Sequence, residues 1–101
     1  MKNTTLETSR IPYLKLKNGS VWEFQWDDRF QGWTYMARKH LYKIFIDGVK
    51  DRKYDWETPM VWIGMFVPRY EDGGDEYSWV TVEKEIGADE LHIDRAIIKF
   101  T

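Results

Sequence analysis

Residues 11–26, IPYLKLKNGSVWEFQW, alternate apolar and polar side chains on both sides of the dipeptide Asn18-Gly19, a pattern typical of a β-hairpin. The turn decides which side chains share a face, because a register shift of one residue moves a whole strand to the opposite face. A two-residue Asn18-Gly19 loop would put the leucines and the aromatic residues on opposite faces. A three-residue loop of residues 17–19, with Gly19 in the left-handed conformation, avoids this split. We therefore predict this loop, which gathers on one face Leu14, Leu16, Trp22, Phe24 and Trp26.

The segment that follows the hairpin changes its period. Its apolar residues recur at spacings of three and four, which is typical of an amphipathic helix. Asp28 is a candidate N-cap, Gln31 completes a capping-box pattern, and Gly48 supplies a stop. We predict a helix over residues 29–40, against a competing reading of residues 42–48 as a strand. The periodic residues are Phe30, Trp33, Ala37, Leu41, Ile44 and Phe45.

The longest apolar run, MVWIGMFVPRY, covers residues 60–70. Such a run is suited to a central strand with apolar side chains on both faces. We expect residues 60–67 to be the most buried strand, with Pro68 at its end or at an edge bulge.

Two more segments have strand patterns. Residues 77–86, YSWVTVEKEI, place Val80, Val82 and Ile86 on one side of a strand. Residues 91–100, LHIDRAIIKF, fit either a helix or a strand with a bulge near Asp94, and the turn signal before them favours the strand.

These elements predict an α+β fold. It consists of a single antiparallel sheet of about five strands, an N-terminal hairpin and a later meander, with one amphipathic helix packed on a face. An all-β fold is the alternative. The length of 101 residues suits one domain, so residues 11–101 are expected to form it and residues 1–10 to be a loose N-terminal segment.

Composition excludes several function classes. The 15 basic and 17 acidic side chains give a formal net charge of −2, without the basic excess that phosphate-backbone binding requires. The absence of cysteine excludes disulfides and thiolate metal sites. No apolar stretch resembles a signal peptide or is long enough to span a bilayer, so we expect a cytoplasmic protein without a membrane partner.

No residue pattern predicts catalysis, a metal site or a cofactor. His40 and His92 have no second histidine at the spacing that metal sites on helices use. His92 and Asp94 would share a face of a strand, which is the basis of a hydrolase hypothesis, yet no nucleophile accompanies them. The carboxylates of residues 71–76 lack the spacing of a calcium loop. We therefore predict a protein that is not an enzyme.

The aromatic content is high, with six Trp, six Tyr and five Phe. Tyr77 and Trp79 lie on the strand side opposite Val80, where they are expected to be exposed. Residues 50–57 surround two aromatic residues with charges, a composition that burial would leave with unpaired ions. Aromatic and arginine side chains dominate binding hot spots, so the predicted partner-binding residues are Arg52, Tyr54, Trp56, Tyr77 and Trp79.

Three function classes follow from these residues. The first is a non-catalytic protein-binding module, such as an inhibitor or immunity-type protein of viral or mobile-element origin. The second is an aromatic platform that binds single-stranded nucleic acid or carbohydrate. The third is the small hydrolase. A homodimer is also expected, because a second copy can cover a free sheet edge or an exposed aromatic face.

Overall fold

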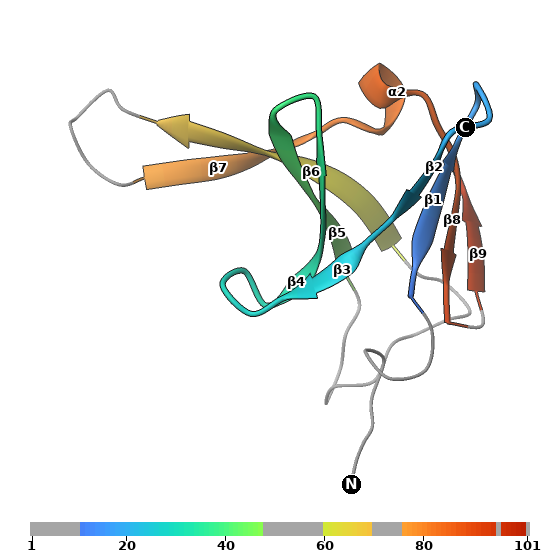
Figure 1. Ribbon diagram of the computed structural model, residues 1–101, viewed down its shortest axis with the longest axis horizontal. Helices are drawn as coiled ribbons and strands as arrows, with labels where there is room; N and C mark the ends of the chain where they lie inside the picture. The colour runs from blue at the N-terminus through green and yellow to red at the C-terminus, as the bar shows by residue number, and fades with distance from the viewer. Residues whose placement is uncertain (1–10, 48–59, 70–75, 95, 101) are drawn as a thin grey trace, which may run out of the picture.

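The computed structural model describes residues 11–47, 60–69, 76–94 and 96–100, which form two antiparallel sheets and one helical turn (Figure 1). The four-stranded sheet has the order β2-β1-β8-β9, and the five-stranded sheet has the order β3-β4-β5-β6-β7. The protein is therefore mostly β, and the predicted single sheet with a helix on its face is wrong. The elements are β1 (Tyr13–Leu16), β2 (Val21–Glu23), β3 (Gln25–Asp27), β4 (Gly32–Ala37), β5 (His40–Asp47), β6 (Met60–Arg69), β7 (Glu76–Thr81), α2 (Glu83–Ile86), β8 (Ala88–Ile93) and β9 (Ala96–Lys99).

The N-terminal hairpin has the predicted register. Leu14 pairs with Trp22, and Leu16 N–H donates to the carbonyl of Ser20, which leaves residues 17–19 as the loop. Gly19 has a φ of 93°, the left-handed conformation that this loop requires. The three-residue loop is thus confirmed.

Phe24 joins the two sheets. β2 ends at Glu23 and β3 begins at Gln25, so the chain passes from one sheet into the other at Phe24, whose side chain is completely buried. The Phe24 N–H donates to the carbonyl of Pro12 at 3.0 Å, which fixes the bend against the start of β1. After the bend, β3 no longer places Trp26 in the core, and this side chain is 40% exposed. Its predicted core position is therefore wrong.

The core lies between the inner faces of the two sheets. Trp22 of the four-stranded sheet stacks on Tyr35 of the five-stranded sheet, with ring centroids 4.9 Å apart. Alternate residues of each strand point inward, as the period of a strand requires. The buried apolar residues are Leu14, Leu16, Trp22, Phe24, Trp33, Tyr42, Ile44, Ile63, Val82, Ala88, Leu91 and Ile93.

The predicted helix over residues 29–40 is wrong. This segment is a turn followed by β4, and a tight turn at Arg38 and Lys39 then leads into β5. Along β4, Trp33 and Thr34 are both buried and Met36 is exposed, so burial follows the packing of the strand and not the helical spacing. The competing strand reading of residues 42–48 is confirmed as far as residue 47, the last residue described there.

β6 is an interior strand of the five-stranded sheet, between β5 and β7, but it is not the most buried strand. Ile63 and Gly64 are buried, whereas Val61, Trp62, Phe66 and their neighbours in β6 are only partly buried. Ile63 is buried in the core that the two sheets share, whereas Trp62 and Phe66 on the other face of β6 belong to a layer of aromatic side chains. Pro68 lies within the strand at a regular register position, so the predicted strand end or bulge there is wrong.

The C-terminal region differs in detail from the sequence reading. The strand predicted to run to residue 86 ends at Thr81, and residues 83–86 form α2, which Gly87 ends with a φ of 73°. Val82 is buried, but Val80 is 45% exposed. The strand preference for residues 91–100 is confirmed, although the chain reverses between the paired Ile93 and Ala96 and has no simple bulge there.

No helix within the described part of the chain is long and apolar enough to cross a membrane.

Candidate functional site

The outer face of the five-stranded sheet carries a continuous group of aromatic side chains. We call this group the aromatic face, and it is composed of Phe30, Phe45, Trp62, Phe66, Tyr77 and Trp79. Five of the six come from β5, β6 and β7, where cross-strand pairing places their Cα atoms side by side. Tyr77 is 49% exposed, and the other five side chains are partly buried against one another.

Gly64 lies at the centre of the aromatic face and allows the rings to meet. A Cβ atom at this position would lie 2.8 Å from Cε2 of Phe45, 3.0 Å from Cζ3 of Trp62 and 3.1 Å from Cβ of Trp79. The missing side chain leaves the space in which the Phe45 and Trp62 rings stack at a centroid distance of 4.0 Å. Gly64 is therefore needed for the packing of the face, and not for an unusual backbone conformation.

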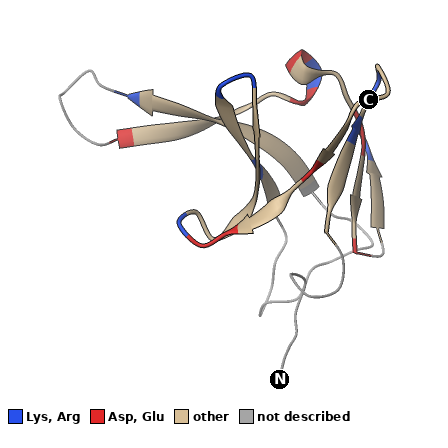
Figure 2. Ribbon diagram, in the orientation of Figure 1, with Lys and Arg blue, Asp and Glu red and all other residues tan. Residues whose placement is uncertain are grey.

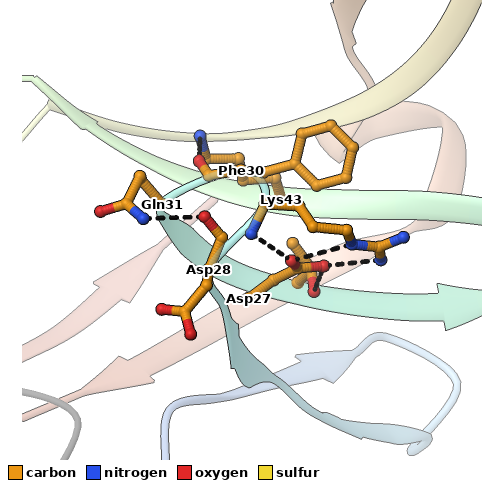
Figure 3. Close-up of polar contacts among 7 residues, drawn as sticks. Asp27, Asp28, Phe30, Gln31 and Lys43 are labelled. Carbon is orange, nitrogen blue, oxygen red and sulfur yellow. Dashed lines mark hydrogen bonds and ion pairs between the residues drawn. The ribbon is translucent and has the colours of Figure 1, made fainter.

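Phe30 is brought to the face by the turn between β3 and β4. The turn is held by Gln31, which has a φ of 50° and whose Nε2 donates to the carbonyl of Asp28 at 2.7 Å (Figure 3). The Phe30 ring then meets the rings of Phe66 and Trp79 at centroid distances of 5.6 and 5.4 Å, in edge-to-face geometry. A residue predicted to lie in a helix thus becomes part of the surface.

Lys43 is the cation of the aromatic face. Its Nζ donates to the Phe30 carbonyl (Figure 3). It also lies 4.8 Å from the centroid of the Phe45 ring and 5.7 Å from that of Trp79. Burial lowers the pKa of Lys43, because removing the ammonium from water disfavours its charged form. The charge of Lys43 is therefore used within the protein to bind the turn to the sheet.

Arg29 forms an ion pair at the surface, where 76% of its side chain is exposed. Its Nη2 and Nε donate to the Asp27 carboxylate at 2.9 and 3.2 Å, and its guanidinium carbon lies 5.3 Å from the Phe30 ring centroid. The hydrogen bonds from Arg29 lower the pKa of Asp27, since they favour the charged carboxylate. The two cations next to the aromatic rings thus both have partners.

A recess of about 330 Å³ lies at the edge strand β3, which is the edge of the five-stranded sheet opposite β7. It combines the exposed Trp26 and Met36 with polar groups, and the Trp26 ring is oriented by a 2.8 Å hydrogen bond from its Nε1 to Asp28. The recess is lined by Glu23, Gln25, Trp26, Asp27, Thr34, Tyr35 and Met36.

The structure brings together two of the five predicted partner-binding residues. Tyr77 and Trp79 both belong to the aromatic face, as expected from their position opposite Val80. Arg52, Tyr54 and Trp56 lie outside the described residues. Sequence reasoning missed Phe30, Phe45, Trp62 and Phe66 as surface residues because it assigned them to a helix or to a fully buried strand. For Phe45, the available signal was the β-branched Ile44 and Ile46 on either side of it, which favour a strand over a helix.

His92 does not pair with Asp94. β8 ends at Ile93, and His92 Nε2 lies 3.0 Å from Oε1 of Glu90, while its ring stacks on Tyr13 at a centroid distance of 4.4 Å. His92 lowers the pKa of Glu90, with smaller contributions from Lys15 and Lys99. This cluster lies on the outer face of the four-stranded sheet. Within the described ranges, no group of three or more potential metal ligands is present.

Comparison of the chain with protein-family models, with curated proteins and with solved structures finds no match in any of the three.

Proposed function

We propose that the protein is a non-catalytic protein-binding module and that its contact surface is the aromatic face. The observation that carries the proposal is the group of six aromatic side chains on the outside of a sheet, one of them half exposed. Contiguous apolar surface with a polar border is typical of protein interaction sites. Here the border is supplied by the Asp27 and Arg29 pair and by Gln31.

The charges near the face support a protein partner over single-stranded nucleic acid. A nucleic-acid platform combines free ring faces with cations that contact phosphates. Lys43 is hydrogen-bonded to the Phe30 carbonyl, Arg29 is paired with Asp27 although its side chain is exposed, and Phe45 and Trp62 stack on each other. Figure 2 shows that β6 and β7 carry charged residues only near their ends, at Arg69 and Glu76. Contact with a partner would therefore depend on apolar area and shape.

A small cysteine-free chain with spare aromatic residues suits an inhibitor or immunity-type protein of viral or mobile-element origin, which acts by covering a surface of its target. Nothing in the described surface requires a cofactor for that role.

The test compares two charge substitutions at exposed apolar residues. Tyr77→Glu puts a carboxylate on the aromatic face, and Ile97→Glu puts the same group on the four-stranded sheet, where Ile97 is 60% exposed. Each variant and the unmodified protein are used to capture proteins from cells that naturally contain the chain. We expect Tyr77→Glu to lose the captured partner and Ile97→Glu to retain it. Equal capture by both variants would exclude the aromatic face as the contact surface.

The salt dependence of capture distinguishes the kinds of partner. Apolar contact changes little between low and physiological salt, whereas nucleic-acid binding weakens steeply because phosphate counterions are released. Capture of nucleic acid that disappears at higher salt would replace the protein-binding proposal with the platform alternative.

A further inference from the structure

β7 is an edge strand without the usual protection against pairing with another strand. In the two described sheets, β2, β3, β7 and β9 each pair on one side only. β2 and β3 have three residues each, and β9 has four and carries Lys99. The six residues of β7 keep an unbroken register with β6 and contain no lysine and no proline. Edge strands are normally shortened, charged or bulged to prevent association.

The hydrogen bonding of β7 identifies the backbone groups on its free edge. Val82 N–H donates to the carbonyl of Ile63 at 3.0 Å, which makes this a hydrogen-bonded position opposite β6. Alternate residues of an antiparallel strand direct both backbone groups to the same side. Val80 and Ser78 therefore face β6, whereas Tyr77, Trp79 and Thr81 direct their N–H and C=O groups outward.

Pro68 supports the same assignment independently. It lies opposite Tyr77 in an undisturbed register, yet a proline has no N–H to donate. The pair of Pro68 and Tyr77 is consequently a non-hydrogen-bonded position between β6 and β7. The backbone groups of Tyr77 must then point away from β6, toward the free edge.

We propose that two copies of the chain associate by antiparallel pairing of their β7 strands about a two-fold axis. When the two-fold axis is perpendicular to the sheet, the residue at the axis pairs with the same residue of the second copy. Only an axis at Trp79 lets all the outward backbone N–H and C=O groups of β7 form hydrogen bonds across the interface. Trp79 then faces Trp79 of the second copy, and Tyr77 faces Thr81 at both ends. Each of these pairs exchanges two backbone hydrogen bonds.

The charge distribution and shape of β7 favour a second copy as the occupant. Residues 77–81 are uncharged. Pairing of two β7 strands therefore desolvates no charged side chain and places no like charges opposite each other. The two Glu76 residues lie at opposite ends of the paired strands, about 20 Å apart, beyond the range of strong repulsion in salt. Figure 1 shows the β6–β7 hairpin extending away from the rest of the molecule, which leaves room for an approaching copy.

The dimer goes beyond the proposed function and does not depend on it. Pairing in this register keeps Tyr77, Trp79 and Thr81 of both copies on the same face of a continuous ten-stranded sheet. The aromatic face would thereby be doubled, with the two Trp79 rings at its centre. The two-fold arrangement is closed, so it predicts dimers and not filaments.

The first experiment measures mass against concentration by sedimentation equilibrium. We expect the 12.2 kDa chain to approach twice that mass as its concentration rises from the low micromolar range. Thr81→Pro removes an outward N–H without removing a bond to β6, and it should raise the dimer dissociation constant at least about tenfold. Thr81→Val keeps the N–H and should dimerise like the unmodified chain. Equal dimerisation of both variants would place the interface elsewhere.

Amide hydrogen exchange tests the same pairing in the unmodified chain, so the result does not depend on the folding of a variant. The amides of Ser78 and Val80 should be protected at every concentration, because they face β6. The amides of Tyr77, Trp79 and Thr81 should become protected only where the mass shows a dimer. A monomeric mass throughout, or a dimer that leaves these three amides unprotected, would overturn the proposal. Pairing of β7 with a peptide of another protein by a monomeric chain would overturn it as well.

Discussion

Gly64 shows how a single residue determines the candidate site. Glycine is usually unfavourable within a strand, because it has no side chain to pack and loses more backbone entropy on folding. Here the absence of Cβ lets Phe45 and Trp62 stack and lets Trp79 approach them from the next strand. The missing side chain of Gly64 thus permits contacts among the three larger side chains around it.

Replacement of Gly64 by alanine should therefore destabilise the protein. We expect Gly64→Ala to reduce the free energy of unfolding by about 1–3 kcal/mol, since the new Cβ would have to displace ring atoms and the Cβ of Trp79. Chemical denaturation followed by tryptophan fluorescence measures the change.

Gly32→Ala is the matched control for this substitution. A Cβ atom at Gly32 would meet only the Lys43 side chain, so its accommodation would cost the Lys43 hydrogen bond to the Phe30 carbonyl but would displace no ring and no backbone atom. Its cost should be smaller than that of Gly64→Ala, and the reverse order would show that the rings adapt more easily than the lysine.

At the scale of elements, the β4–β5 hairpin has a turn that its sequence does not favour. Ala37 pairs with His40, and the two residues between them, Arg38 and Lys39, have φ values of 52° and 68°. A two-residue hairpin turn with both central residues in this conformation prefers asparagine followed by glycine, because other side chains are strained there. The register of the flanking strands therefore imposes the turn.

Lys39→Gly should relieve this strain. We expect the substitution to raise the free energy of unfolding by up to about 1 kcal/mol, which corresponds to about 4–8 °C in the melting temperature of a domain of this size. Thermal unfolding followed by circular dichroism measures the shift. Lys39→Ala removes the same charge but keeps the strain, so a similar gain in that variant would attribute the effect to charge.

At the scale of the whole molecule, Phe24 couples the two sheets. It lies at the only residue between β2 and β3, and its side chain contacts the core from the bend itself. The Trp22 and Tyr35 stack lies next to this bend and joins the inner faces. Loss of packing at Phe24 should therefore affect both sheets together.

Phe24→Ala should cost about 3–5 kcal/mol of unfolding free energy, the usual range for a completely buried phenylalanine. Phe66→Ala removes the same ring from a partly buried position on the aromatic face and should cost less. Denaturant titration of both variants gives the comparison. Equal losses would mean that the aromatic face is packed as tightly as the core.

The sequence by itself determined the local features of this protein. The loop at Gly19 and the hairpin register follow from residues that are close along the chain, where turn chemistry and a period of two are sufficient. The position of Tyr77 and Trp79 opposite Val80 follows from the same period, and the half exposure of Tyr77 agrees with it.

Only the tertiary structure decided which faces are covered. The spacing of apolar residues over residues 29–40 is compatible with a helix, and pairing with β3 and β5 overrides it. The apolar side chains on both faces of β6 likewise gave no sign that Ile63 is buried in the core while Trp62 and Phe66 on the other face are only partly buried. The aromatic face exists because packing between distant strands leaves that side of the sheet outside the core, and such long-range contacts have no local signature in the sequence.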